Sequence, residues 1–379
     1  MIIRPAFIVT ILSLCTFLPG FLFADEDYPT LAIGAPAPDF RLPGVDGREY
    51  SLSDFQQAKV LAVIFTCNHC PTAQAYEERI KQLVTDFKDK GVAFVAISPN
   101  DPKAVRLDEL GWSDMSDSFE EMKLRAEHKQ FNFPYLYDGD TQEVSKAYGP
   151  KATPHVFIFD EARRLRYVGR VDENERRPDQ VKSPDARNAI EALLAGKPVP
   201  VEHTRTFGCS VKWADKRSSV DEAFAKWAQE PVTIKVADSA QVKQLLENRS
   251  DKLRLVNVWA TWCGPCRVEF PDLVTINRMY RHREFELITI SADDLQDKEK
   301  ALAFLKEQQA STTNLIFAES GYKLFDVLDD FAGGKMSSGA LPYTMLIAPG
   351  GKVIYRKEGR IDPLVVKREI IKVMGNTYR

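Results

Sequence analysis

The chain has 379 residues, of which 44% are hydrophobic and 28% charged, and its formal net charge is −3. Such a composition supports folded cores and excludes a wholly disordered chain, and the lack of a basic excess argues against a nucleic-acid-binding protein. The length favours two domains with room for a short leader, and six cysteines are too few for a small fold held together by disulfides.

Residues 1–24 have the pattern of a secretory signal. Arg4 supplies a positive charge, an uncharged stretch runs from Ala6 to Phe23, and Ala24 precedes an acidic run. Cleavage after Ala24 would release an exported protein, whereas an uncleaved leader would anchor it in the membrane through residues 5–23. Either interpretation places the folded part in the periplasm or another extracytoplasmic compartment, where cysteine pairs can cycle between dithiol and disulfide.

The first half of the chain carries a cysteine pair between a predicted strand and a predicted helix. Residues 60–65 are an apolar run of strand length, as expected for a strand buried on both faces. Cys67-Asn68-His69-Cys70 follows after one intervening residue, and apolar residues then recur at helical spacing from Ala73 to Phe87. Both thiols are therefore predicted at a strand-to-helix junction.

The rest of this half continues with alternating elements. Gly91–Ser98 reads as the next strand, and Thr153-Pro154 precedes a predicted hairpin. The hairpin strands are predicted at 155–159 and 165–168, and a closing helix at 186–194. We expect the first domain to cover about residues 30–200.

Residues 196–231 lack a long apolar period and contain only a short helical pattern at 220–227. Two interpretations are open: a linker over residues 201–230, or a C-terminal extension of the first domain. Cys209 lies in this segment. It is either a third redox thiol, which resolves or relays between the two centres, or an inert buried thiol.

The second half repeats the order of the first. A strand at 253–259 leads to Cys263-Gly264-Pro265-Cys266, and a helical pattern continues to Met279. The next strand recurs at 285–291, and Leu341-Pro342 again precedes a hairpin. The hairpin strands are predicted at 343–347 and 353–355, and the closing helix at 364–373. This repeat favours a second tandem domain over residues 231–379.

Strand, C-x-x-C, helix and a later proline before a hairpin form the pattern of the thioredoxin superfamily, which both halves resemble. Residues 259–271 closely resemble the TlpA/ResA-like exported thioredoxins, and the first half, with its lead-in at 33–47, resembles the redoxin branch shared by alkyl-hydroperoxide-reductase-like and TlpA-like proteins. The resemblance implies two tandem α/β folds, each with a central mixed β-sheet flanked by helices. It also implies a thiol–disulfide oxidoreductase with antioxidant activity and no cofactor beyond its own redox-active disulfides, Cys67–Cys70 and Cys263–Cys266.

Disulfide exchange requires a thiolate, which a helix N-terminus stabilises through unpaired N–H groups and the positive end of the helix dipole. We expect Cys67 and Cys263 to occupy that place and to attack the substrate disulfide. Cys70 and Cys266, one helical turn further along, would then resolve the mixed disulfide. These four cysteines are the predicted catalytic residues.

The residues between the cysteines predict the direction of electron flow. Gly264-Pro265 is the pair found in reducing thioredoxins. A protonated or dipolar His69 near Cys67 would favour the thiolate and so the reduced form, whereas the alternative is a solvated surface imidazole without influence. We therefore predict that the first pair is more oxidising than the second.

Several residues are expected to support the two centres. The resemblance implies that Pro154 and Pro342 are cis, which would leave backbone groups of Thr153 and Leu341 free to pair with a bound peptide. Leu341 departs from the β-branched residue common at that position. Trp262, directly before the second pair, is expected to shield the disulfide and to offer an apolar contact.

Thioredoxins often carry a buried acid six residues before the first cysteine. Leu61 and Asn257 stand at those positions, and neither can act as a base. Proton transfer would then use water or another carboxylate, with Glu269 and Asp293 as weak candidates. The interpretation preferred for both acids is a solvated surface charge.

Three other functions are compatible with parts of the sequence pattern. A zinc site would require cysteines from two separate repeats to come together, so no metal is predicted. A thiol-dependent peroxidase would need a proline and threonine spacing that is missing around Cys67. A redox-inert binding module is conceivable for the first half, although two intact pairs argue against it. The expected partners are protein thiols or disulfides and an unidentified electron donor, with membrane contact only if the leader is retained.

Overall fold

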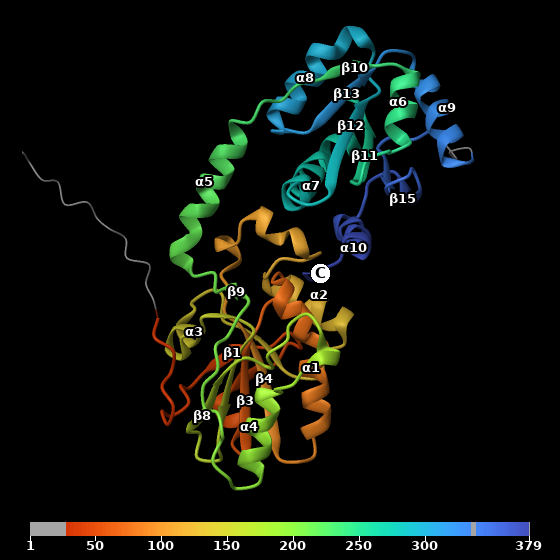
Figure 1. Cartoon of the computed structure of the whole chain (residues 1–379). Helices are drawn as coiled ribbons and strands as arrows, with labels where there is room; N and C mark the ends of the chain where they lie inside the picture. The colour runs from red at the N-terminus through yellow and green to blue at the C-terminus, as the bar shows by residue number, and fades with distance from the viewer. Residues whose placement is uncertain (1–27, 335–338, 379) are drawn as a thin grey trace, which may run out of the picture.

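The computed structural model describes residues 28–334 and 339–378, so the predicted leader, residues 1–24, lies outside the described part of the chain. Figure 1 shows two bodies of sheet and helix, joined by a long helix, α5 (Arg217–Ala228). In the described residues, no helix combines the length and the apolar character needed to cross a bilayer.

The first sheet has the strand order β5–β4–β3–β7–β8. β3 pairs in parallel with β4 and antiparallel with β7, so the sheet is mixed, as predicted. Its strands are β3 (Val60–Phe65), β4 (Val92–Ser98), β5 (Tyr135–Tyr137), β7 (His155–Phe159) and β8 (Leu165–Gly169). A small ribbon of β1 (Arg41–Pro43) and β2 (Glu49–Ser51) precedes them.

Strand β3 explains why an unbroken apolar run is needed before the first cysteine pair. Val60, Ala62 and Ile64 pack into one core cluster, together with side chains of α1 (Pro71–Phe87) and α4 (Asp185–Leu194). Leu61, Val63 and Phe65 pack into a second cluster on the opposite face. Since side chains alternate across a strand, burial on both faces makes every position apolar.

The second sheet has the order β10–β13–β12–β11–β14–β15 and is also mixed, because β11 pairs in parallel with β12 and antiparallel with β14. Its strands are β10 (Lys235–Ala237), β11 (Leu253–Trp259), β12 (Phe285–Ser291), β13 (Thr313–Phe317), β14 (Tyr343–Ile347) and β15 (Val353–Glu358). The central strands of the two sheets thus follow the same order, and each half has the predicted α/β architecture.

Helices cover the faces of both sheets. In the first half the remaining helices are α2 (Phe119–Lys129) and α3 (Glu143–Tyr148). In the second half they are α6 (Ser239–Leu246), α7 (Gly264–Tyr280), α8 (Lys298–Glu307), α9 (Gly321–Ala332) and α10 (Pro363–Met374). In each half the C-x-x-C pair lies where the central strand meets the following helix, β3 to α1 and β11 to α7.

Much of the predicted linker packs on the first sheet. His203 forms a parallel bridge with Val168 of β8, and β9 (Cys209–Ser210) pairs antiparallel with β6 (Ala152–Thr153). The first part of the 201–230 segment is therefore an extension of the first domain and not a linker, which was the second of the two interpretations. The chain passes from the first body to the second through α5 in Figure 1.

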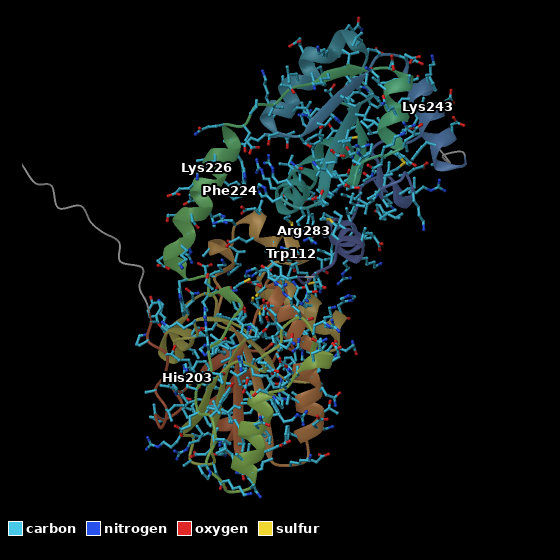
Figure 2. All side chains as sticks on the ribbon, in the orientation of Figure 1. Trp112, His203, Phe224, Lys226, Lys243 and Arg283 are labelled. Atoms are coloured by element: carbon cyan, nitrogen blue, oxygen red, sulfur yellow. A yellow bond between two sulfur atoms is a disulfide. The ribbon has the colours of Figure 1, made fainter. Side chains whose placement is uncertain are left out.

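The two bodies are in contact. The Arg283 guanidinium lies 3.7 Å from the ring centre of Trp112 and donates to the Gly111 carbonyl oxygen at 2.9 Å (Figure 2). The Tyr280 hydroxyl donates to the Ser113 carbonyl oxygen at 2.7 Å. The chain end returns to the first domain, where Tyr378 packs 4.9 Å from Trp112, measured between ring centres.

Candidate active site

The first cysteine pair lies on the loop between β3 and α1, but α1 begins one turn later than expected. Cys70 is its N-cap residue, Pro71 is its first residue, and the Ala73 N–H points at Cys70 Sγ (3.5 Å). Proline suits the first helical position because its missing N–H would have no partner there. The prediction that Cys67 occupies the helix N-terminus is therefore wrong: Cys70 does, and Cys67 lies in the preceding loop.

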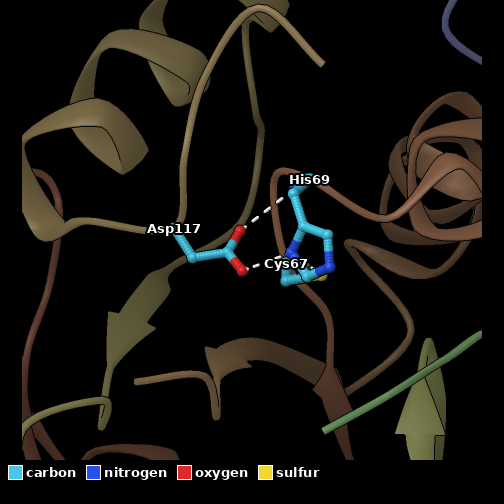
Figure 3. Close-up of side chains that lie close together, drawn as sticks. All are labelled: Cys67, His69 and Asp117. Atoms are coloured by element: carbon cyan, nitrogen blue, oxygen red, sulfur yellow. Dashed lines mark hydrogen bonds and ion pairs between the residues drawn. The ribbon is translucent and has the colours of Figure 1, made fainter. Parts of the chain in front are cut away.

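A buried carboxylate holds this loop. Asp117 Oδ1 accepts the backbone N–H groups of Asn68 (2.8 Å) and His69 (3.0 Å), while Asp117 Oδ2 lies 2.5 Å from His69 Nδ1 (Figure 3). Asn100 Nδ2 donates to the same oxygen at 2.7 Å. His69 is only 1% exposed, so the alternative of a solvated imidazole is wrong.

The pair formed by His69 and Asp117 carries charge inside the protein. Burial disfavours the imidazolium, but the charge of Asp117 and its hydrogen bond outweigh burial and raise the pKa of His69. Burial likewise opposes ionisation of Asp117, and His69 holds the pKa of that carboxyl below its ordinary value. The two groups therefore form an imidazolium–carboxylate pair next to the thiols, with His69 Nδ1 3.7 Å from Cys67 Sγ.

The environment favours the thiolate on Cys70 and not on Cys67. Burial raises the pKa of Cys67 well above its ordinary value, and its hydrogen bond to Cys70 and the charge of Asp117 add to this effect. Burial also opposes ionisation of Cys70, but hydrogen bonds from Cys209 and Cys67 and the charge of His69 hold its pKa well below the ordinary value. One contact favours the protonated thiol of Cys70 instead, because its Sγ can donate to the Thr153 carbonyl oxygen at 3.3 Å.

Thr153 and Pro154 lie beside the first pair, and the bond between them is cis. The Thr153 hydroxyl lies 3.1 Å from Cys67 Sγ. Its backbone is not free to pair with a peptide, contrary to expectation, because Thr153 is already paired with Cys209 in the β6–β9 ladder. The chain supplies its own strand at the edge where we expected a substrate.

The second pair is joined as a Cys263–Cys266 disulfide. Cys263 is the N-cap residue of α7 and its Sγ accepts the Cys266 N–H at 3.2 Å, so this cysteine does occupy the predicted place. The two sulfurs are buried, but the surrounding residues are exposed, with Trp262 at 68%. Gly264 and Pro265 are exposed as well. Trp262 therefore offers its apolar surface to solvent next to the disulfide.

Leu341 and Pro342 are the counterparts of Thr153 and Pro154, and the peptide bond between them is also cis. Leu341 is partly buried between the two core clusters of the second sheet. Among the described residues, no strand pairs with Leu341, whereas Thr153 has one. The residues before the two cis prolines therefore differ, because in the part of the chain that the structure describes Thr153 is paired with a strand of its own chain and Leu341 is not.

The preference for solvated charges at Glu269 and Asp293 is wrong, since both are buried, at 1% and 2% exposure. Asp293 accepts the Thr261 N–H and hydroxyl, and so holds the loop before Cys263 much as Asp117 holds the first loop. Glu269 accepts from Asn257 Nδ2 at 3.0 Å and from the Ile361 N–H at 2.6 Å. Burial raises the pKa of Glu269 despite these bonds.

Metal-ligand atoms also meet at the first centre. In the described chain, Cys67, His69 and Asp117 offer three ligand atoms within 4.8 Å of one another. A closed zinc site takes four ligands, and here His69 Nδ1 carries the proton that it donates to Asp117, so this nitrogen has no lone pair for a metal. The arrangement suits a charged hydrogen-bond network better than a metal centre.

Sequence reasoning missed Asp117, Asn100 and the position of Cys209. Asp117 lies 48 residues from His69 in an irregular segment, and no periodicity or spacing marks it. Nothing in the sequence indicates that Cys209 and Ser210 form a strand against Ala152 and Thr153. Only the folded chain brings these side chains to the first pair.

The chain is similar in sequence to thiol:disulfide interchange proteins. The thiol:disulfide interchange protein HelX of Rhodobacter capsulatus is 29% identical over half of this chain and 82% of its own length. DsbE of Escherichia coli K12, also a thiol:disulfide interchange protein, is 31% identical over 31% of this chain and 55% of its own length.

Among solved structures, an uncharacterized conserved protein from Geobacillus kaustophilus is 38% identical and covers 50% of this chain and 94% of its own, with a TM-score of 0.43. The Redoxin family matches residues 32–190 and again residues 225–368. These two matches together span most of the chain, which belongs to the Redoxin family.

Proposed function

We propose that this protein is an exported thiol–disulfide oxidoreductase that exchanges protein disulfides through two unequal C-x-x-C centres. The observation that carries the proposal is the Cys263–Cys266 disulfide at the N-terminus of α7, flanked by exposed Trp262. The named relatives HelX and DsbE, which are thiol:disulfide interchange proteins, support the same activity.

At the second centre, Cys263 attacks the disulfide of a protein partner. Its thiolate faces the Cys266 N–H and the positive end of α7, which stabilise the negative charge. The mixed disulfide forms between Cys263 and the partner, and Cys266 resolves it to close the disulfide and release the partner as a dithiol. The exposed Trp262 gives a partner an apolar contact beside the reacting sulfur.

The first centre is proposed to be the more oxidising of the two. Stabilising a thiolate stabilises the reduced state, and so raises the reduction potential of a cysteine pair. Cys70 Sγ accepts N–H groups from Ala73 and Cys209 and feels the charge of His69. The expected order is the one predicted from Asn68-His69 against Gly264-Pro265, but the stabilised sulfur is Cys70.

Proton transfer at the second centre is assigned to Glu269. This carboxyl lies one turn beyond Cys266 on α7, and burial raises its pKa. It becomes a base only as the pH rises through that raised value, and it can then accept the proton that Cys266 must lose. Asn257 and the Ile361 N–H fix its two oxygens.

Glu269→Gln is expected to slow closure of the Cys263–Cys266 disulfide roughly tenfold, less than a general base often contributes because water can substitute. The variant should also lose the rise in rate with pH that ionised Glu269 provides. Stopped-flow tryptophan fluorescence between pH 5 and 9 would measure both, with Glu299→Gln, at an exposed position of α8, as the matched control. An unchanged pH profile would exclude Glu269 as the proton acceptor.

The proposed partners are protein thiols or disulfides and an electron donor, which exchange with the protein outside the cytoplasm. The sequence motif of the leader carries the export proposal, since residues 1–24 lie outside the described part. Expression of the full chain with a C-terminal tag, followed by fractionation and N-terminal sequencing, tests it. Mature protein starting at Asp25 in the periplasm is expected, and an unprocessed cytoplasmic chain would contradict it.

The activity is tested by stoichiometry. A fully reduced chain mixed with excess disulfide-containing protein, such as insulin, is expected to lose the thiols of Cys263 and Cys266 first, while the substrate gains an equal number. Alkylation and mass mapping would assign the loss to Cys67, Cys70, Cys263 and Cys266. If none of these thiols is consumed and the substrate gains none, the proposed function is wrong.

A further inference from the structure

The strand that carries Cys209 is built tightly into the first centre. In the β6–β9 ladder, Ser210 pairs with Ala152 and Cys209 with Thr153. Gly208 comes before them with a φ of +134°, and a Cβ on this residue would lie 2.0 Å from the Thr153 carbonyl oxygen. Only glycine permits this approach. The position of Cys209 is therefore specified by the fold.

Cys209 contacts the sulfur of Cys70. The Cys209 N–H donates to Cys70 Sγ at 3.2 Å, and the Cys209 thiol forms a further hydrogen bond to Cys70. The three cysteines and Ala73 form one apolar cluster. Within it, Cys67 is 3% and Cys70 0% exposed, whereas Cys209 is partly exposed. Cys209 is thus the most exposed of the three cysteine residues of the first centre.

A surface pocket of about 210 Å³ opens beside this cluster. It is lined by Pro71 and Thr72, which directly follow Cys70, by the side chains of Arg79 and Arg176, and by Tyr378 at the chain end. A pocket of this size admits a small disulfide or a single side chain, but not a folded protein. The three cysteines do not line this pocket, so the access of an external disulfide to the cluster rests on the partly exposed Cys209.

We propose that Cys209 is the sulfur through which the buried Cys67–Cys70 pair exchanges with external disulfides, by way of a transient Cys70–Cys209 disulfide. This inference rests on the disulfide-exchange function proposed above. It gives the first centre an attacking thiol supplied by its own chain, at the strand edge where a peptide substrate was expected.

The proposed steps conserve atoms and electrons. Cys209 attacks an external disulfide, passes its proton to the Cys70 thiolate and forms a mixed disulfide, while one half of the external disulfide leaves as a thiolate. This thiolate takes the proton from Cys70, and Cys70 attacks Cys209, releasing the second half as a thiolate. Cys67 gives its proton to that thiolate and attacks Cys70, which frees Cys209. Two thiols are oxidised and one external disulfide is reduced.

The intermediate can be trapped by removing Cys67. In the full-length chain with Cys263 and Cys266 replaced by serine, Cys67→Ser leaves Cys70 and Cys209 as the reacting thiols. After treatment with oxidised glutathione, the expected product is a Cys70–Cys209 disulfide, identified by peptide mapping. The matched control is the same protein with Cys209→Ser, which cannot form it. If Cys70 and Cys209 remain unlinked in a folded Cys67→Ser protein, the proposal is overturned.

The second readout is a rate. With Cys67 present, Cys209→Ser is expected to slow closure of Cys67–Cys70 by oxidised glutathione about tenfold, because access to the attacked sulfur limits exchange. Gly208→Ala keeps the thiol but displaces its strand, and is expected to slow closure as well. Equal rates with and without Cys209 overturn this inference alone. If Cys67–Cys70 closes in none of the proteins, the function proposed for the first centre fails, and the inference with it.

Discussion

Replacing Cys263 with serine is expected to abolish catalysed reduction of protein disulfides, leaving only the rate of the added dithiol. Cys263 is the N-cap sulfur of α7 and lies next to exposed Trp262, whereas the first pair is enclosed by its own chain. A serine hydroxyl ionises far too weakly to attack a disulfide. Insulin reduction with dithiothreitol as the electron donor measures the effect by turbidity.

The matched control for this prediction is Cys67→Ser, which removes the corresponding residue of the buried centre. Its rate of insulin reduction is expected to stay close to that of the unmodified protein. Cys266→Ser is expected to trap the mixed disulfide between Cys263 and insulin. If Cys263→Ser still reduces insulin at the original rate and Cys67→Ser does not, the activity belongs to the first centre and this prediction is wrong.

Asp117→Asn is expected to lower the free energy of unfolding by about 3 kcal/mol, the lower end of the cost of breaking a buried ion pair. The substitution leaves His69 without its carboxylate and weakens the bonds to the Asn68 and His69 N–H groups. Urea denaturation would measure the loss. Asp89→Asn, on an exposed turn, is the matched control and is expected to change stability little.

The effect of Asp117→Asn depends on pH with a defined sign. The pKa of His69 is raised in the folded protein, so its contribution is fully present below the ordinary histidine value and is lost as the pH rises through the raised pKa. The pKa of Asp117 is lowered, so its contribution is present above the ordinary aspartate value and is lost in stronger acid. The difference between the two proteins should be largest between these limits, and a constant difference would contradict the ion pair.

The central elements of both halves could be predicted because hydrophobic burial leaves a direct pattern in the sequence. β3 is buried on both faces and is an unbroken apolar run, β11 is mostly apolar apart from Arg254 and Asn257, and a cysteine pair follows each strand. The predicted closing helices at 186–194 and 364–373 correspond to α4 and α10 within one residue at each end.

The start of the two helices could not be transferred from one half to the other. Pro71 follows its cysteine pair and begins α1, whereas Pro265 lies inside its pair as the second residue of α7. This difference of one turn places Cys70 in one half and Cys263 in the other at a helix N-terminus. The spacing C-x-x-C is the same in both, so spacing alone does not reveal which sulfur is stabilised.

Contacts between distant segments were also beyond the sequence pattern. Asp117 and Cys209 reach the first pair from irregular or short extended segments, where no apolar period indicates the direction of a side chain. Glu269 and Asp293 look like surface acids in the sequence, but hydrogen bonds from Asn257, Ile361 and Thr261 satisfy them in the interior. Such burial depends on partners that only the fold supplies.

The two centres are most directly compared by their reduction potentials, measured in the full-length chain. One protein would carry Cys263→Ser and Cys266→Ser with Cys209→Ser, and the other Cys67→Ser and Cys70→Ser with Cys209→Ser, each equilibrated in glutathione or dithiothreitol buffers and alkylated. The account predicts that both pairs titrate as two-electron couples and that Cys67–Cys70 has the less negative potential. The opposite order, or a first pair that never forms a disulfide, would contradict it.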